Sequence, residues 1–165
     1  MSMIGNYRRL TPLELNSLRE NPRSVMAFLY SADRSRPPEN RHLDIEKSWH
    51  VIHFLLNGDA WDGDSTLVNV VLGGSDLSDE GFGYGTVRFL LPDEVREVSE
   101  ALSDVPAFEL LQRFDAEALN DAEIYPHGWS DDSKEGEYIR GHYVALQEFF
   151  DQAAKAGDAM LLYLN

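Results

Sequence analysis

Residues 44–58, DIEKSWHVIHFLLNG, constrain the fold most, because they read as one capped helix that is apolar almost all round. Asp44 is placed to cap its start, and Gly58 takes the C′ position after a helix over 45–57. On a helical wheel the core stripe consists of Ile45, Trp49, Ile52 and Leu56. Such a helix needs neighbours on most sides, so the sequence predicts a central buried helix with Trp49 in the core.

The same helix carries two histidines three positions apart. His53 falls at the edge of the core stripe, whereas His50 falls on the polar side with Glu46. We therefore expect His53 within or beside the core and His50 on the surface, where His50→Ala changes stability by no more than about 0.5 kcal/mol. The alternative is a metal-ligand stripe of Glu46, His50 and His53. A zinc helix usually spaces its histidines four apart and has a third ligand elsewhere, so no metal site is expected.

The rest of the chain alternates short capped helices with few strands. The expected elements are a strand over 3–10, helices beginning at Pro12 and Pro22, an exposed connection over 32–42, a short helix over 66–72, a strand over 84–90, helices over 92–102, 107–114, 115–126 and 135–156, and a final strand over 158–165. This pattern predicts an α+β fold, in which several helices cover a small, mostly antiparallel or mixed sheet of about three strands. We expect one domain over residues 1–165.

The net charge of −15 is unevenly distributed along the chain. Residues 1–50 carry eight Lys/Arg and six Asp/Glu, whereas residues 51–165 carry six and twenty-three. Such an acidic surface repels the phosphates of nucleic acids and of anionic membranes, so neither is expected as a partner. Electrostatics favour a basic protein or a cationic ligand, although acidity can also serve only to keep a protein in solution. The oligomeric state cannot be predicted.

Several classes of protein are excluded by what the chain lacks. It has no cysteine, which rules out disulfides, thiolate metal sites and a cysteine nucleophile. Its first residues lack the apolar run of a signal peptide and its apolar stretches are too short to span a bilayer, so we expect a cytoplasmic protein. The glycines of 81–85 precede a strand, and the aspartates of 59–64 fit no calcium-loop register. No cofactor is therefore expected.

Two further residue groups allow a structural and a functional interpretation. Arg88, in the middle of the strand over 84–90, points outward from the sheet or anchors a buried carboxylate, and we expect it to point outward. In the loop AEIYPHGWS at 122–130, Tyr125 and Trp129 either bind a ligand or plug the rim of the fold, and we expect packing. No nucleophile elbow or acid/base pair can be nominated, so the sequence leaves open whether the protein is an enzyme.

Five segments of the chain carry a family resemblance in unbroken order. They are MSMIGNYRRL (1–10), LDIEKSWHVIHFLLNG (43–58), GYGTVRFLLPDEVREV (83–98), FDAEALNDAEIYPHGW (114–129) and AGDAMLLYLN (156–165). Together they resemble the YfbM-like family of bacterial proteins of unknown function. The resemblance implies a small α+β domain in the bacterial cytoplasm and brings no established activity, cofactor or partner. The matching positions include Trp49, His53, Tyr84, Arg88, Pro92, Tyr125 and Pro126.

Two functional hypotheses follow. The first is a non-catalytic interaction protein, like an inhibitor or immunity protein, whose acidic residues 51–165 engage a basic macromolecule. The second is a small-molecule-binding protein or enzyme, whose pocket would collect the ligand-binding residues Trp49, His53, Tyr84, Arg88 and Tyr125. We favour the first, because the charge is split between the two parts of the chain and no catalytic motif is present.

Overall fold

The structure is a computed structural model that describes residues 1–30 and 40–165. The strands of its sheet are β1 (Gly5–Leu10), β2 (His42–Asp44), β3 (Ser75–Asp76), β4 (Arg88–Leu90) and β5 (Ala159–Leu164). The α-helices are α1 (Pro12–Glu20), α2 (Val25–Tyr30), α3 (Trp49–Asn57), α4 (Pro92–Ser103), α5 (Ala107–Gln112), α6 (Ala116–Asp121) and α7 (Ser133–Ala156). Short 3₁₀ helices are η1 (Pro22–Ser24), η2 (Glu46–Ser48) and η3 (Thr66–Val70). Most of the expected connection over 32–42 lies outside the described residues.

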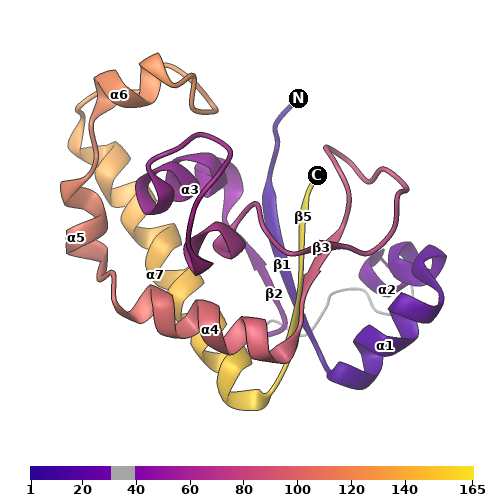
Figure 1. The fold of residues 1–165 in the computed structure, drawn as a ribbon. Helices are drawn as coiled ribbons and strands as arrows, with labels where there is room; N and C mark the ends of the chain where they lie inside the picture. The colour runs from indigo at the N-terminus through magenta and orange to yellow at the C-terminus, as the bar shows by residue number, and fades with distance from the viewer. Residues whose placement is uncertain (31–39) are drawn as a thin grey trace.

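The sheet has the strand order β2-β1-β5-β4-β3, and each neighbouring pair is antiparallel. Strands β1 and β5 form its centre, with six residue pairs from Gly5–Leu164 to Leu10–Ala159. Both strands are buried on both faces, which agrees with the apolar sequence of β5, whereas β1 also buries the polar side chains of Asn6, Arg8 and Arg9. The two chain ends lie side by side at one end of the sheet, where the backbones of Ile4 and Asn165 bond to each other (Figure 1).

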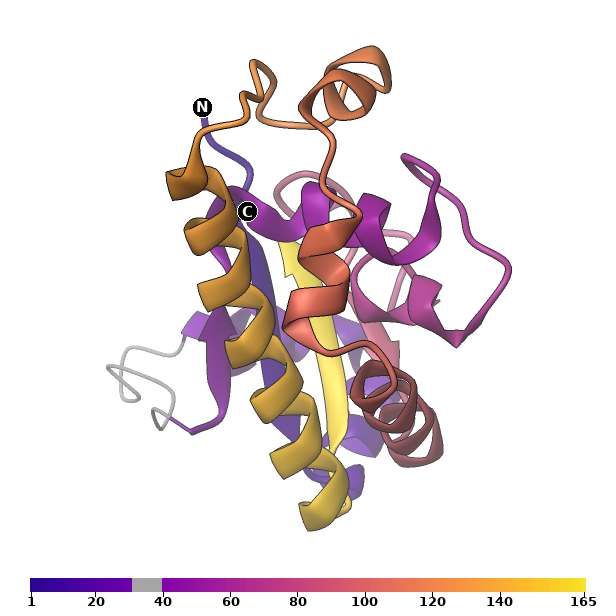
Figure 2. The same cartoon turned by 90° about the vertical axis from the view of Figure 1, so that its left-hand side faces the viewer.

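Helices cover both faces of the sheet, and the sheet separates two hydrophobic cores. Figure 1 shows α3, α4, α5 and α7 on one side and α1 and α2 on the other. Tyr7 and Leu162 point into the larger core with α3 and α7, whereas Leu10 and Leu161 point into the smaller core under α1 and α2. This is the alternation expected of neighbouring residues in a strand. Seen at right angles, α7 runs alongside β1 and β5 (Figure 2).

The helix boundaries follow from capping chemistry. Thr11 and Glu14 form a capping box at the start of α1, with bonds of 3.1 and 3.0 Å. Asp132 caps α7 through the backbone N–H of Lys134, and Gly157 ends that helix with a φ of 72°. Among the described residues no helix combines the length and the apolar character needed to cross a membrane.

The α+β class is confirmed, but the prediction of about three strands is wrong. The described residues form five strands, because β2 and β3 are edge strands of three and two residues that are too short to show a period in sequence. The strand expected over 84–90 is also shorter, since the chain before Arg88 is a loop rich in glycine. The helix expected over 45–57 begins with the 3₁₀ turn η2 and becomes α-helical at Trp49.

Candidate functional site

Four rings, Tyr125, Trp49, His50 and Trp61, cluster between α3 and two loops, and we call them the ring stack; Trp61 contacts both His50 and, at 6.5 Å between centroids, Trp49. The centroid distances are 5.7 Å from Tyr125 to Trp49, 4.8 Å from Trp49 to His50 and 4.4 Å from His50 to Trp61. The angles between neighbouring planes are 24°, 12° and 38°. Aromatic contacts of this kind add attraction beyond burial alone. The ring stack therefore fixes the loops around Trp61 and Tyr125 to the same helix.

His50 is 1% exposed, and both of its ring nitrogens are hydrogen-bonded. Nδ1 accepts the backbone N–H of Tyr125 at 2.9 Å, and Nε2 donates to the carbonyl oxygen of Ala60 at 2.8 Å. Burial lowers the pKa of His50, and this outweighs the opposing effect of the bond to Ala60. A neutral imidazole with its proton on Nε2 satisfies both contacts.

The prediction that His50 lies on the surface is wrong. On the isolated helix it does fall on the polar side, near Glu46. The chain after Gly58, however, folds back across this side and places Ala60 and Trp61 over the imidazole. Gly58 makes this reversal with a φ of 70°, a left-handed conformation that glycine adopts without strain. A helical wheel describes one helix and cannot detect a loop that covers it.

His53 is fully buried one turn further along α3, as predicted. Asn57 donates to the carbonyl oxygens of His53 at 3.0 Å and Leu67 at 3.3 Å, which joins α3 to η3. Burial is the main cause that lowers the pKa of His53, followed by the neighbouring His50. Nε2 of His53 and Oδ1 of Asn57 have no hydrogen-bond partner among the described residues. Across residues 1–30 and 40–165, no three His, Cys, Asp or Glu side chains are placed to hold a metal ion.

Trp61 is the outermost ring of the stack and is 61% exposed. Its loop is rigidified by Asp59, whose Oδ1 accepts the backbone N–H groups of Trp61 at 2.8 Å and Asp62 at 2.9 Å. These two bonds lower the pKa of the Asp59 carboxyl group. Trp61 was not among the predicted site residues. The available signal was a tryptophan placed two residues after an aspartate in a glycine-bounded loop, the spacing of an Asx turn.

Arg88 lies on the same face of the sheet as Tyr7 and Leu162, so the prediction that it points outward is wrong. It is partly buried and donates to the carbonyl oxygens of Val71 at 2.9 Å and Gly73 at 2.6 Å. Burial lowers the pKa of its guanidinium group. The partners are backbone carbonyls at the end of η3 rather than a carboxylate, and such partners leave no signature in a sequence.

The five residues predicted to bind a ligand are distributed over several elements. Trp49 and Tyr125 are neighbours in the ring stack, and both contact the backbone of Met3. The Trp49 indole N–H donates to the Met3 carbonyl oxygen, and the Met3 backbone N–H donates to the Tyr125 hydroxyl. His53 is linked to η3 through Asn57, which bonds to the carbonyl oxygens of His53 and Leu67, whereas Arg88 bonds to carbonyl oxygens just after η3. Tyr84 is exposed, and its backbone N–H bonds to Leu164. The gap between Trp49, Tyr7 and Arg88 is too small to admit a water molecule.

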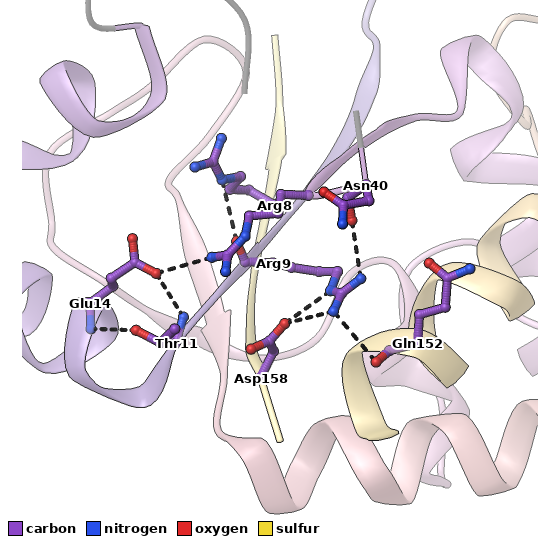
Figure 3. A network of polar contacts seen from close by, with 8 residues as sticks. Arg8, Arg9, Thr11, Glu14, Asn40, Gln152 and Asp158 are labelled. Atoms are coloured by element: carbon purple, nitrogen blue, oxygen red, sulfur yellow. Dashed lines mark hydrogen bonds and ion pairs between the residues drawn. The ribbon is translucent and has the colours of Figure 1, made fainter. Parts of the chain in front are cut away.

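A second polar network joins β1 to the segment between α7 and β5 (Figure 3). The Arg9 guanidinium contacts the Asp158 carboxylate through Nε at 3.0 Å and Nη2 at 2.9 Å, and both side chains are buried. Arg9 also donates to the carbonyl oxygens of Asn40 at 3.1 Å and Gln152 at 3.5 Å. This pair was not predicted, although two adjacent arginines between Tyr7 and Leu10 in an expected strand are a detectable signal. Its full set of partners indicates a structural role.

The acidic side chains of residues 51–165 form much of the surface. Of these 23 carboxylates, all but Glu94, Glu109, Glu135 and Asp158 are exposed. A groove of about 380 Å³ between α4 and α7 is lined by three of them, Glu100, Glu148 and Asp151. Three of the exposed bases pair with acids of their own helix: Arg96 with Asp93, Arg113 with Glu109, and Lys155 with Asp151. The surface around α4 to α7 is therefore strongly negative.

Comparison with known proteins establishes the family. The sequence model of the domain of unknown function DUF1877 matches residues 1–163. The chain belongs to the DUF1877 family. A relative, protein YfbM of Escherichia coli (strain K12), is 28% identical over 152 residues, which cover 90% of this chain and 87% of YfbM.

The fold also matches a solved structure. The crystal structure of YfbM from Escherichia coli, described as a protein of unknown function, superposes with a TM-score of 0.73 at 23% identity. The match covers 98% of this chain and 99% of the YfbM chain. At this identity the likeness establishes the fold alone. The resemblance seen in the sequence is thus confirmed, and the DUF1877 region contains both the ring stack and the Arg9–Asp158 pair.

Proposed function

We propose that this protein is a non-catalytic binding protein whose acidic surface engages a basic partner protein, in the manner of an inhibitor or immunity protein. The observation that carries the proposal is the excess of exposed carboxylates over bases in residues 51–165. Like charges gathered on one part of a surface steer an oppositely charged partner and raise its association rate. A basic protein is the partner that gains most from this arrangement.

The distribution of the remaining bases supports the same conclusion. Of the six bases in residues 51–165, Arg88 is held by backbone carbonyls, Arg96, Arg113 and Lys155 are paired within their own helices, and Lys134 and Arg140 are exposed on α7. These pairs do not cancel the negative charge, because α4 alone carries five acids, Asp93, Glu94, Glu97, Glu100 and, at its end, Asp104. The groove between α4 and α7 adds Glu148 and Asp151 beside Glu100. A basic side chain that enters this groove meets several carboxylates together.

The buried titratable groups also favour binding over catalysis. Both ring nitrogens of His50 are committed to backbone groups of Tyr125 and Ala60, so this imidazole is not free to exchange a proton with a substrate. The Arg9–Asp158 pair is buried and fully engaged. The residues with the most distinctive chemistry thus stabilise the fold, which leaves the exposed carboxylates to recognise a partner.

Capture from lysate with a charge-neutralised control tests this proposal. Immobilised wild-type protein is compared with a variant that carries Glu97→Gln, Glu100→Gln, Asp104→Asn and Glu148→Gln, and with a charge-preserving control that carries Ser17→Ala, Ser99→Ala, Ser103→Ala and Gln112→Ala. We expect basic proteins to be retained by the wild type and the control at about 50 mM salt, released at about 500 mM, and not retained by the neutralised variant. Equal retention by all three proteins, or retention that salt does not weaken, would contradict the proposal.

A further inference from the structure

We propose that Trp61, with the carboxylates of Asp59, Asp62 and Asp64 around it, is the contact point for an arginine side chain of the basic partner. This inference rests on the proposed function and names the chemistry by which the partner is recognised. It assigns a role to the single large aromatic side chain that the loop over 57–65 exposes.

The exposure of Trp61 differs from that of the other two tryptophans. Trp61 is 61% exposed, whereas Trp49 is 1% and Trp129 is 8% exposed. Scattered apolar side chains are common on surfaces, so exposure alone does not indicate a site. Both the backbone and the side chain of Trp61, however, are held in place. Its backbone N–H bonds to Asp59, and its ring packs against the His50 ring. A preordered tryptophan loses little conformational entropy on binding, and tryptophan is enriched among residues that dominate binding energy.

The charges around Trp61 select a cation. The loop over 57–65 contains three aspartates and no lysine or arginine, and Asp59, Asp62 and Asp64 are all exposed. The two backbone N–H bonds to Asp59 favour its ionised form. A cation near such carboxylates is attracted by charge and, above the indole, by the quadrupole of the ring. Arginine suits this surface better than lysine, because its planar guanidinium stacks on an aromatic ring while it donates several hydrogen bonds to carboxylates.

A second observation singles out the same loop. Nε2 of His53 and Oδ1 of Asn57 are buried without a hydrogen-bond partner among the described residues. Oδ1 of Asn57 lies directly beneath this loop, so close to Gly63 that a β-carbon there would stand 2.3 Å from it. Buried polar groups are normally satisfied. Because the backbone of this loop covers Oδ1 of Asn57, the loop that presents Trp61 packs closely on α3.

Binding of two labelled peptides, octaarginine and octalysine, tests the inference. Fluorescence anisotropy measures their dissociation constants for the wild type, Trp61→Ala, Trp61→Phe and the control Phe108→Ala, whose side chain is 67% exposed on α5. We expect the wild type to bind octaarginine more tightly than octalysine. Trp61→Ala should weaken octaarginine binding between about threefold and thirtyfold, the range of a cation–π contact, while Trp61→Phe retains most of the affinity. Phe108→Ala should bind as the wild type does.

The outcomes separate the inference from the function on which it rests. If Trp61→Ala binds octaarginine as tightly as the wild type, while the neutralised α4 and α7 variant binds it more weakly, the assignment of Trp61 is wrong and the proposed function stands. If the wild type binds neither peptide, the proposed function fails and the inference fails with it. Equal weakening by Trp61→Ala and Phe108→Ala would also overturn the inference, because it would show no specific contact at Trp61.

Discussion

The backbone N–H of Tyr125 donates a hydrogen bond of 2.9 Å to Nδ1 of His50, although the two residues are 75 positions apart. The other nitrogen of the same ring bonds to Ala60, in the loop on the opposite side of the imidazole. One side chain of α3 therefore holds both loops that complete the ring stack. The surface position of Trp61 depends on this bridge, because its ring lies on that of His50.

Replacement of His50 should destabilise the fold. His50→Ala removes one ring of the stack and leaves the N–H of Tyr125 and the carbonyl of Ala60 without their partners, and we expect a loss of about 2–4 kcal/mol in the free energy of unfolding. His127→Asn is the matched control, since His127 is exposed and its φ of 81° is one that asparagine tolerates. Urea titration of both variants checks this, and a loss below about 0.5 kcal/mol for His50→Ala would show that the bridge contributes nothing.

The free energy of unfolding should decrease as the pH is lowered below the ordinary pKa of histidine. Burial lowers the pKa of both His50 and His53, so between their native pKa values and about 6.5 the unfolded chain binds more protons than the folded chain. The stabilisation is therefore complete above about pH 6.5 and is lost as the pH decreases toward the native values. Urea titrations at about pH 7.5 and about pH 5.5 should show this loss, and His50→Phe should show a smaller one. A wild type that is equally stable at both pH values would contradict the assignment of neutral buried imidazoles.

The two tryptophans at either side of His50 should differ in their importance for folding. Trp49 is buried in the larger core, and Trp49→Ala should cost about 3–5 kcal/mol through lost burial and the cavity left behind. Trp61 is exposed, so Trp61→Ala should lower the free energy of unfolding by no more than about 1.5 kcal/mol, the value of an aromatic contact. Thermal or chemical denaturation of the two alanine variants measures the difference. Equal losses would mean that Trp61 serves the fold rather than a partner.

The buried Arg9–Asp158 pair predicts a coupled loss of stability. Asp158→Leu leaves the Arg9 guanidinium buried without its charge partner, and we expect a loss of about 3–5 kcal/mol. Arg9→Met should cost a similar amount, but the double variant should cost much less than the sum, because no charge is then left unpaired. Lys155→Met, which breaks an exposed pair with Asp151, is the control and should change stability by less than about 1 kcal/mol. Strictly additive losses for Arg9 and Asp158 would rule out a direct ion pair.

The local features of the fold could be predicted from the sequence where the relevant chemistry is local. The capping box at Thr11, the left-handed Gly157 and the buried stripe of α4 depend on residues within a few positions of one another. The edge strands β2 and β3 could not, because two or three residues become a strand only through pairing with β1 and β4. Propensity carries little information over such lengths.

The candidate site was less accessible to sequence analysis for the same physical reason. Trp49 and Tyr125 were nominated, but their contact is made by segments distant in sequence. The surroundings of His50 and Arg88 were predicted incorrectly, since each is satisfied by backbone groups that nearly any residue type can supply. Trp61 was overlooked because its distinguishing property is exposure, which only the folded chain displays.

The central claim is that a basic protein binds to the negative surface around α4 to α7. Photo-cross-linking in cells tests this claim most directly. A photoreactive amino acid at Glu97 on α4 samples that surface, and one at Met26 on α2 samples the opposite side of the sheet (Figure 1). Both positions are exposed, so substitution should leave the fold intact. We predict a cross-linked adduct with a strongly basic protein from Glu97 and none from Met26. An adduct of equal yield from both positions, or adducts from Glu97 with acidic proteins only, would contradict the account.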